Sequence, residues 1–272
     1  MRCLAQPLSV WERRPSNQLC MRWLMLPDQL NSRRLPADFN RQYHALAGLD
    51  TREFLSWVFA PHKPFGEVGV VTSFGTESAV LLHLIADVAP AAPVIFIDTG
   101  FHFEETLAYR DELTHYLGLQ SVRTVGLDPL SEKRSDSARR LHLEHPDACC
   151  QLRKVKVLAH ALRDYDGWVS GQKRYQSRER SKIDRVEWDR ARGKWKFNPL
   201  ADWGTPDLLR YQTQHKMPAH PLASAGYLSV GCSPCTTPVK SGEDMRAGRW
   251  RQHEKLECGL HRPAGLIVAT RG

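Results

Sequence analysis

The sequence contains no apolar run long enough to cross a membrane. Its longest nearly apolar stretch, 88–97, includes Pro90 and Pro93 and falls far short of the roughly 20 residues that a membrane helix needs. Residues 1–20 also lack the continuous apolar segment of a secretion signal. We therefore expect a cytoplasmic protein with no membrane span.

The sequence also lacks the cysteine pattern of a disulfide framework. Its seven cysteines are odd in number, and two of them, Cys149 and Cys150, are adjacent. A chain of 272 residues buries enough surface to form a core without disulfides. In a reducing cytoplasm the thiols are then free to act as metal ligands, redox groups or small core residues.

A phosphate loop that ends in Gly-Lys-Ser/Thr is absent as well. The stretch 73–78 follows a β-branched run at 68–72 and leads into a helical pattern, but it contains no lysine. It offers the hydroxyls of Ser73 and Thr76, and Gly75 lets the backbone approach a ligand closely. These features predict a phosphate or sulfate site, with a simple helix cap as the alternative.

Strand-like and helix-like segments alternate along the chain. The strand-like runs are 68–72, 94–97, 122–125 and 168–170, and the helical patterns are 43–59, 78–88, 104–117 and 151–162. This alternation predicts an α/β fold, a single doubly wound parallel-sheet domain with helices on both faces. We assign the domain to 42–240, between a basic, poorly ordered extension at 1–41 and a C-terminal tail at 241–272.

Ligands of such sheets bind beyond the carboxyl ends of the strands. We therefore expect binding residues in the loops after 72, 97 and 170. The second loop supplies Asp98, Thr99 and Gly100, for which an Asx turn is the alternative. The third loop supplies Gln172, Lys173, Arg174 and Gln176.

The net charge is +8, from 38 Lys and Arg against 30 Asp and Glu. Residues 1–41 hold seven Arg against three acids, and residues 171–196 hold ten basic against four acidic side chains. The rest of the chain is close to neutral, so the basicity is not spread over a nucleic-acid-binding face. The first residues of the stretch 171–196 follow a strand and could bind one small anionic ligand. We interpret the rest of that stretch mainly as a solvent-exposed face.

Four cysteines form two close pairs, Cys149 with Cys150 and Cys232 with Cys235. Ligation by sulfur alone suits zinc or an iron–sulfur cluster. Adjacent cysteines at the start of a helix can both reach one compact cluster. The alternative is a redox dithiol at Cys232 and Cys235, with the other two thiols in the core.

Cys258 stands apart from these pairs, with Gly259 beside it and His261 three residues further on. Arg246 and Arg249 lie upstream, and nearby positive charge lowers the pKa of a thiol. Cys258 is therefore a candidate nucleophile, and an inert cysteine is the alternative.

Eight stretches of the chain resemble one enzyme family, in the order that the family shows. They are SFGTESAVLLHL (73–84), FIDTGFHFEETLAYRDEL (96–113), CCQLRKVKVL (149–158), WVSGQKRYQS (168–177), FNPLADW (197–203), GYLSVGCSPCT (226–236), GEDMRAGRW (242–250) and KLECGLH (255–261). On these motifs the chain resembles the iron–sulfur type of assimilatory adenylylsulfate (APS) reductase, within the PAPS reductase family. That family has the adenine nucleotide α-hydrolase-like fold.

The resemblance implies a reaction in two steps. The Cys258 thiolate would attack the sulfur of APS and expel AMP, and thioredoxin or glutaredoxin would then release sulfite from the S-sulfocysteine. Cys149, Cys150, Cys232 and Cys235 would hold one 4Fe-4S cluster that does not pass electrons. The reaction belongs to sulfate assimilation and cysteine biosynthesis, and the tail that carries Cys258 is expected to be mobile.

The resemblance also implies which residues meet the substrate. The family commonly has Arg where Lys173 stands and Asp where Tyr175 stands, and a lysine is a point charge that cannot contact sulfate through two N–H groups. The implied substrate-binding residues are Ser73, Gly75, Thr76, Asp98, Thr99, Gly100, Arg153, Lys154, Gln172, Lys173, Arg174, Gln176, Arg246, Arg249 and His261.

Two other functions compete with this interpretation. A PAPS reductase performs the same chemistry on a substrate with an added 3′-phosphate, but such enzymes typically lack the two cysteine pairs. An ATP-dependent RNA-modifying protein with a related loop would bind RNA and consume ATP. The partners we expect are APS and a thioredoxin or glutaredoxin, without nucleic acid or membrane, and with a homo-oligomer left open.

Overall fold

The computed structural model describes residues 43, 44, 46, 48–253, 255 and 257–261. The predicted extension at 1–41 lies outside the described residues. The helices are α4 (Thr51–Val58), α5 (Ser78–Val88), α6 (Glu104–Tyr116), α7 (Pro129–Ser135), α8 (Leu141–Glu144), α9 (Pro146–Cys150), α10 (Lys156–Ala161) and α11 (Thr205–Gln214). The strands are β1 (Val68–Thr72), β2 (Val94–Asp98), β3 (Val122–Gly126), β4 (Gly167–Ser170), β5 (Val186–Asp189) and β6 (Lys194–Phe197).

The strands form one six-stranded sheet in the order β3-β2-β1-β4-β6-β5. Strand β1 pairs in parallel with β2 on one side and with β4 on the other, so that Val70 lies opposite both Val94 and Val169. Successive connections therefore turn in opposite directions on either side of β1, which makes the gap beyond β1 and β4 the switch point of the sheet. The prediction of a parallel sheet needs one correction, because the edge strand β5 runs antiparallel to β6.

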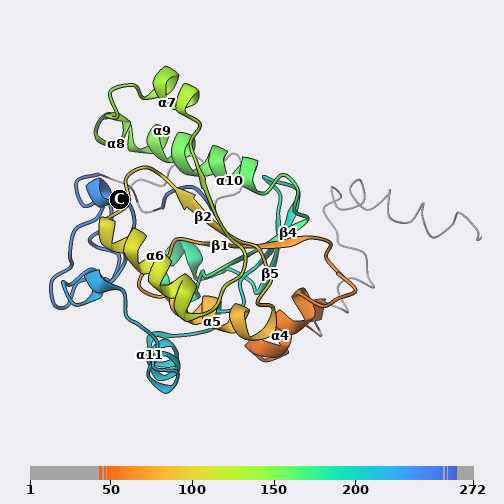
Figure 1. The fold of residues 1–272 in the computed structure, drawn as a ribbon. Coiled ribbons are helices and arrows are strands. Elements are labelled where there is room, and N and C mark those ends of the chain that lie inside the picture. The colour runs from red at the N-terminus through yellow and green to blue at the C-terminus, as the bar shows by residue number, and fades with distance from the viewer. Residues whose placement is uncertain (1–42, 45, 47, 254, 256, 262–272) are drawn as a thin grey trace, which may run out of the picture.

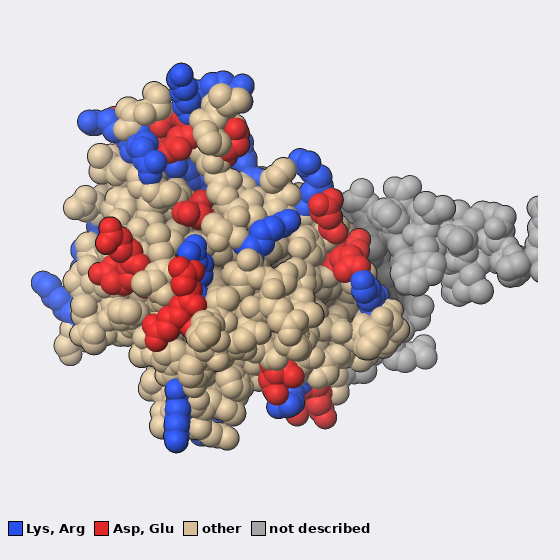
Figure 2. Space-filling view, viewed as in Figure 1, with Lys and Arg blue, Asp and Glu red and all other residues tan. Residues whose placement is uncertain are grey.

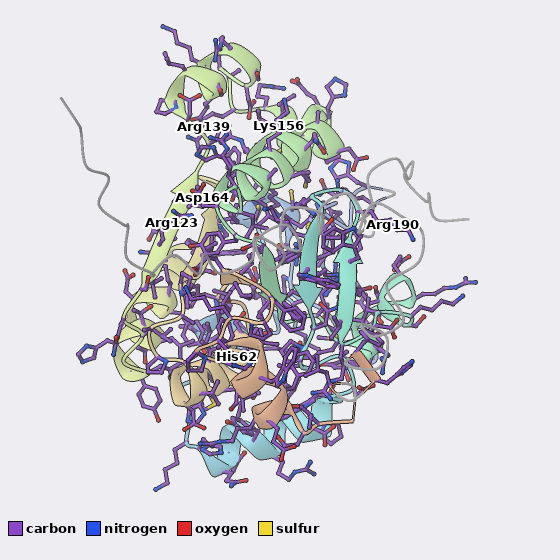
Figure 3. The ribbon with its side chains drawn as sticks, turned by 90° about the vertical axis from the view of Figure 1, so that its right-hand side faces the viewer. His62, Arg123, Arg139, Lys156, Asp164 and Arg190 are labelled. Atoms are coloured by element: carbon purple, nitrogen blue, oxygen red, sulfur yellow. The ribbon has the colours of Figure 1, made fainter. Side chains whose placement is uncertain are left out.

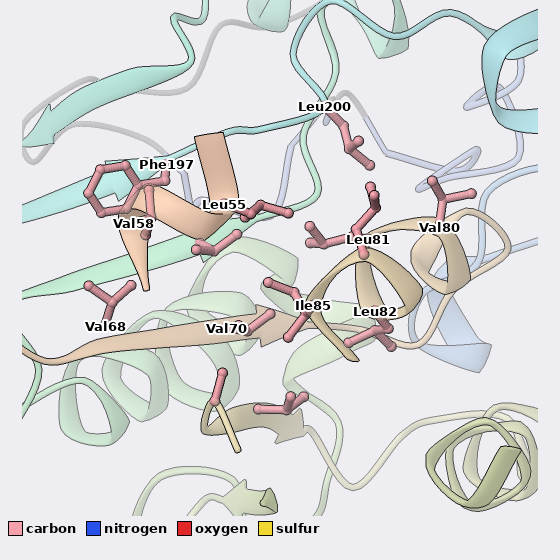
Figure 4. Packing of buried hydrophobic residues seen from close by; sticks show 14 of the residues in the cluster. Leu55, Val58, Val68, Val70, Val80, Leu81, Leu82, Ile85, Phe197 and Leu200 are labelled. Carbon is pink, nitrogen blue, oxygen red and sulfur yellow. The ribbon is translucent and has the colours of Figure 1, made fainter. Parts of the chain in front are cut away.

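Helices cover both faces of the sheet, as the alternation of segments predicts (Figure 1). Helices α4, α5 and α6 pack on one face, where Val70, Ile85 and Phe197 belong to the larger core (Figure 4). Helix α10 covers the other face through a smaller core that includes Leu158 and Trp168. The near-continuous apolar runs of β1 and β2 follow from this burial on two sides.

Strands β5 and β6 lie within the basic stretch 171–196, for which we expected mainly a solvated face. That expectation is wrong for the second half of the stretch. The Lys196 side chain is buried, and its ammonium pairs with the cross-strand Glu187 at 2.8 Å and lies 5.7 Å from the centroid of the Trp168 ring. On the face shown in Figure 2, basic and acidic side chains are intermingled.

Helices α7, α8 and α9 form a group beyond α10, on the side of the sheet away from α4 (Figure 1). Figure 3 shows Arg139 in this group, in the upper part of the view, and His62 in the lower half. Cys149 and Cys150 end α9, and the chain continues without a break through a π-helix at Gln151–Val155 into α10. The cysteine pair is thus inside a helical segment, and the prediction that it precedes the helix is corrected.

Within the part of the chain that the structure describes, no helix combines the length and the apolar character that a membrane crossing requires.

The packing of α5 on the sheet gives a test of the core. Ile85→Ala should lower the free energy of unfolding by about 2–5 kcal/mol, because Ile85 is fully buried and its neighbours cannot close the cavity completely. Urea denaturation measures the change. Leu130→Ala is the control, since Leu130 is 67% exposed, and a loss as large as that of Ile85→Ala would contradict the assigned core.

Candidate active site

A cavity of about 200 Å³ opens at the switch point of the sheet, and we call it the switch-point cavity. Its walls come from the loops after β1, β2 and β4 and from two later segments, 228–231 and 245–261. The structure brings most of the predicted site residues to these walls. They are Ser73, Gly75, Thr76, Thr99, Lys154, Gln172, Lys173, Gln176, Arg246, Arg249, Cys258 and His261.

The loop after β1 presents its backbone to the cavity. Phe74 is buried and has a φ of 47°, which is uncommon for a residue with a side chain. Thr76 anchors the loop by donating its hydroxyl hydrogen to the Leu228 carbonyl at 2.8 Å. Helix α5 then begins without a side-chain cap, so the positive end of its dipole faces the cavity. This arrangement fits the predicted anion site.

Polar atoms that have no partner gather at the same cavity. Among the described residues, seven buried side-chain polar atoms lack a hydrogen bond, and five of them belong to residues that line the switch-point cavity. Because an unpaired buried polar group costs stability, these atoms need partners, which water or a polar ligand in the cavity can supply. The five atoms are His102 Nδ1, Gln172 Oε1, Arg249 Nε, Trp250 Nε1 and His261 Nδ1.

The loop after β4 is held by a buried ion pair. Lys173 Nζ donates to Glu77 Oε2 at 3.0 Å, and the same carboxylate accepts from Gln176 Nε2 at 2.6 Å and from the Tyr175 hydroxyl. Burial lowers the pKa of Lys173, and Glu77 opposes that shift. Lys173 and Tyr175, the two departures from the family pattern, thus share one carboxylate at the start of α5.

Three predicted substrate residues lie outside the cavity because they have other partners. Asp98 accepts from the Gly100 amide at 2.8 Å, which is the Asx turn that we named as the alternative. Arg174 donates to the Ile183 carbonyl at 2.8 Å and pairs with acids at the surface. Gly100 itself has a φ of 71° and serves this turn.

Arg153 also points away from the switch-point cavity. It pairs with Asp136 and with Glu132, each at 2.7 Å, and donates to the Thr99 carbonyl at 3.1 Å. Its guanidinium lies over the Phe101 ring. Arg153 therefore joins the α7–α9 group to the loop after β2 and does not face the same ligand as Lys154.

The four paired cysteines line one small pocket, which we call the cysteine pocket. Cys232 Sγ lies 3.3 Å from Thr99 Oγ1. Burial, followed by the neighbouring thiols, raises the pKa of Cys149 to about 12 and that of Cys235 to about 11. Burial opposes ionisation of Cys232 too, but Lys154 shifts its pKa downward. Lys154 and Thr99 line both pockets and form the wall between them.

This donor set does not resemble the site of a single ion. Within the described residues, no group of three or more His, Cys, Asp or Glu side chains is arranged around one metal ion. A 4Fe-4S cluster distributes its four thiolate ligands over separate irons. Among the described residues, the shared feature of the four thiols is therefore one pocket with the buried Lys154 in its wall.

The C-terminal segment carries Cys258 to the switch-point cavity. Glu257, next to it, pairs with Arg180 at 2.7 Å and with Arg246 at 3.2 Å. His261 stacks on the Trp168 ring with 5.4 Å between centroids. The described part of the tail is thus docked, whereas its mobility remains a prediction. Burial, with further help from Arg180, lowers the pKa of Arg246 to about 10.

Sequence reasoning missed several residues of this site, among them the charged residues Glu77, Arg180 and Glu257. Each belongs to one of three stretches described above: 73–78, the basic stretch 171–196 and the KLECGLH motif at 255–261. Their function is to pair with other site residues, and a sequence pattern does not show which charges meet. The one sequence feature that could have pointed to Glu257 is its position directly before Cys258, the candidate nucleophile.

Residues 67–238 match the family model of the phosphoadenosine phosphosulfate reductase domain. The chain belongs to this reductase family. The family stretch includes the loops after β1, β2 and β4 and both cysteine pairs. It ends before Cys258, so the docked tail is additional support for the site and not part of the match.

Curated relatives cover most of the chain. An adenosine 5′-phosphosulfate reductase of Mesorhizobium japonicum is 46% identical over 75% of this chain and 79% of its own length. One of Streptomyces coelicolor is 41% identical, over 77% and 87%. A phosphoadenosine 5′-phosphosulfate reductase of Gloeobacter violaceus is 43% identical, over 72% and 83%.

A solved structure shares the fold. The phosphoadenylyl-sulfate reductase of Candida auris, in a phosphate complex, aligns with a TM-score of 0.63 and covers 76% of this chain and 100% of its own. At 23% identity this likeness supports the architecture of the sheet and its helices.

The buried Lys173–Glu77 pair generates a prediction about stability. Glu77→Gln should lower the free energy of unfolding by about 3–5 kcal/mol at pH 7, because it leaves the Lys173 ammonium buried without its counter-charge. The deficit should shrink as pH rises toward about 10, since the unfolded state then binds more protons than the folded one. Urea denaturation across this pH range measures both effects.

Glu179→Gln is the matched control, because Glu179 is an exposed acid in the same region. It should change the free energy of unfolding by less than about 0.5 kcal/mol. A deficit in Glu77→Gln that stays constant from pH 7 to 10 would contradict a charged Lys173 as its cause.

Proposed function

We propose that the protein reduces APS to sulfite and AMP in sulfate assimilation, as an oxidoreductase that acts on a sulfur group. The observation that carries this proposal is the position of Cys258, which lies at the switch-point cavity together with Lys154, Arg246 and Arg249. A nucleophilic thiol and three cations at one cavity are what an attack on an anionic sulfur centre requires. The names of the curated relatives support the same reaction.

The cavity has one part suited to each half of the nucleotide. Apolar side chains of Val71, Leu81 and Ile97 line it near the sheet and suit an adenine base. The loop after β1 and the start of α5 suit the phosphate, through backbone N–H groups and the helix dipole. The sulfate would then face the cations and the docked tail.

In the first chemical step the Cys258 thiolate attacks the sulfur of APS. An S–S bond forms, the bond between sulfur and the bridging oxygen breaks, and AMP leaves with the electron pair of that bond. Lys154, Arg246 and Arg249 stabilise the charge that develops on the departing phosphate. The product on the enzyme is S-sulfocysteine.

In the second step a dithiol protein of the thioredoxin or glutaredoxin type attacks the Cys258 sulfur. Sulfite leaves, and a mixed disulfide forms between Cys258 and the donor. The second thiol of the donor then restores the Cys258 thiol, so the donor becomes a disulfide and supplies the two electrons. Because a whole protein must reach Cys258, the tail has to leave its docked position, which is the movement that the predicted mobility provides.

Cys149, Cys150, Cys232 and Cys235 would hold a 4Fe-4S cluster. The fit rests on four thiols around one pocket and on the buried Lys154 in its wall. When bound, such a cluster would tie the end of α9 to the 232–235 loop and place negative charge beside Lys154. Because Lys154 lies between the two pockets, its ammonium would offset both the negative charge of the cluster and that of the nucleotide.

PAPS is the second candidate substrate, because the Gloeobacter violaceus relative carries that name at 43% identity. The two cysteine pairs favour APS. The test of the nucleophile described next also compares APS with PAPS, and so decides between the two substrates.

The first test concerns the nucleophile. Wild-type protein mixed anaerobically with APS should gain the mass of one sulfonate group, measured on the intact protein. In Cys258→Ser this adduct should form at least about 100-fold more slowly, because the nucleophile is gone. Cys3→Ser, the same change at a cysteine to which no role is assigned, should keep it. An adduct on Cys258→Ser would move the nucleophile elsewhere, and faster formation with PAPS would change the substrate.

The second test concerns the metal. Protein purified without oxygen should be brown and contain about four irons and four sulfides per chain. Cys232→Ser removes one ligand and should lose most of the iron, whereas Cys258→Ser should retain it. Colourless protein that contains zinc alone would refute the cluster.

A further inference from the structure

Two arginines, Arg180 and Arg246, hold the carboxylate of Glu257 in the described part of the tail. Arg180 grips it with two N–H groups, Nε to Oε1 at 2.7 Å and Nη2 to Oε2 at 2.9 Å. Arg246 Nη2 lies 3.2 Å from Oε2. The side chains of Glu257 and Arg180 are only 9% and 11% exposed, so solvent screens their attraction weakly. Paired contacts of this kind fix geometry as well as adding energy.

This grip is connected to the rest of the cavity wall. Arg180 also donates Nη1 to Gln176 Oε1 at 2.5 Å, and Gln176 donates to Glu77 at 2.6 Å. Glu77 in turn pairs with Lys173. A chain of charged and polar contacts therefore runs from the start of α5 through the loop after β4 to the residue before Cys258.

Other contacts hold the tail on both sides of Glu257. Lys255 is buried and pairs with Asp147 at the start of α9. On the other side, Arg192 donates to the Leu260 carbonyl at 3.0 Å, and His261 stacks on Trp168. Loss of the Glu257 contacts would thus leave the tail attached but would free the segment around Cys258 to shift.

Glu257 is also an anion within a cavity that we assign to an anionic nucleotide. It lines the cavity together with Arg180, Arg246 and Arg249. Its negative charge reduces the attraction of these cations for a second anion. For tight nucleotide binding alone, a carboxylate at this position is unfavourable, which indicates that it serves another purpose.

We propose that Glu257 is a positioning residue, which sets the Cys258 sulfur against the substrate through the grip of Arg180 and Arg246, at the expense of nucleotide affinity. This role rests on the proposed function. This role predicts opposite effects on the rate of sulfocysteine formation and on the affinity for AMP, whereas loss of a merely structural ion pair would lower both. Positioning raises the rate of sulfocysteine formation, and the carboxylate charge weakens the binding of AMP.

The test uses full-length protein under anaerobic conditions. Single-turnover intact mass gives the rate of adduct formation at saturating APS, and calorimetry with AMP gives nucleotide affinity without chemistry. Glu257→Gln keeps the shape of the side chain but removes its charge and the grip. Its adduct rate should fall about 100-fold, the typical cost of a nucleophile displaced by about 1 Å. Its affinity for AMP should rise about three- to tenfold.

Glu257→Asp separates the two effects, because it keeps the charge and shortens the reach by one methylene group. It should keep the wild-type affinity for AMP and lose at least about tenfold in adduct rate. Arg180→Lys, which keeps the positive charge but not the two-point contact, should also slow the adduct. Glu243→Gln, an acid that pairs with Arg251 outside the cavity, should change neither quantity.

Each result has a defined meaning. A wild-type adduct rate in Glu257→Gln, or a loss of AMP affinity in parallel with its rate, overturns the role of Glu257 and leaves the proposed function intact. Absence of an adduct on the wild-type protein itself would instead refute the proposed function. If Glu257→Gln does not fold, Glu257→Asp and Arg180→Lys decide, since wild-type rates in both would overturn the proposal.

Discussion

The site depends on the parallel pairing of β1 with both β2 and β4. Because β1 has a parallel neighbour on each side, the helix that follows it, α5, covers one face of the sheet, and the helix that precedes β4, α10, covers the other. The loops at this edge therefore separate and leave a cavity between them. The cysteine segments and the tail pack around that opening, so their positions follow from the order of the strands.

Charge is distributed unevenly around this opening. Each of its two acids is matched by a cation from a different segment, Glu77 by Lys173 and Glu257 by Arg180. Lys154 and Arg249 are buried, and within the described residues neither forms an ion pair with a carboxylate. Glu257 acts on Arg249 from beyond ion-pair distance, and the Cys232 thiol acts on Lys154, so a further anion near either cation is favourable. The cavity and the cysteine pocket together are thus suited to receive anions on both sides of Lys154.

Sequence reasoning succeeded where one local signal determines the outcome. The runs at 68–72 and 94–97 became β1 and β2 because their residues are buried on both faces, and the loop at 73–76 reached the cavity because it follows β1. It failed for β5 and β6, because the charged residues of β5 (Glu187, Asp189) and of β6 (Lys194, Lys196) hide the pattern of two strands that pair with each other. For Arg153, a charge near the cysteines did not reveal which acids would bind it, since Asp136 and Glu132 come from another helix.

The π-helix between α9 and α10 has a further consequence. Each residue of an α-helix advances by about 100°, so the wider turn of 151–155 changes the direction in which later side chains point. The three consecutive residues Leu152, Arg153 and Lys154 are all buried there, which a regular surface helix does not allow. One continuous helical segment can therefore direct two cysteines into the cysteine pocket, Lys154 into the wall between that pocket and the switch-point cavity, and Val157 and Leu158 into the core. Removing a single residue from this turn would rotate Cys149 and Cys150 by about 100° relative to Val157 and Leu158, and so away from the cysteine pocket.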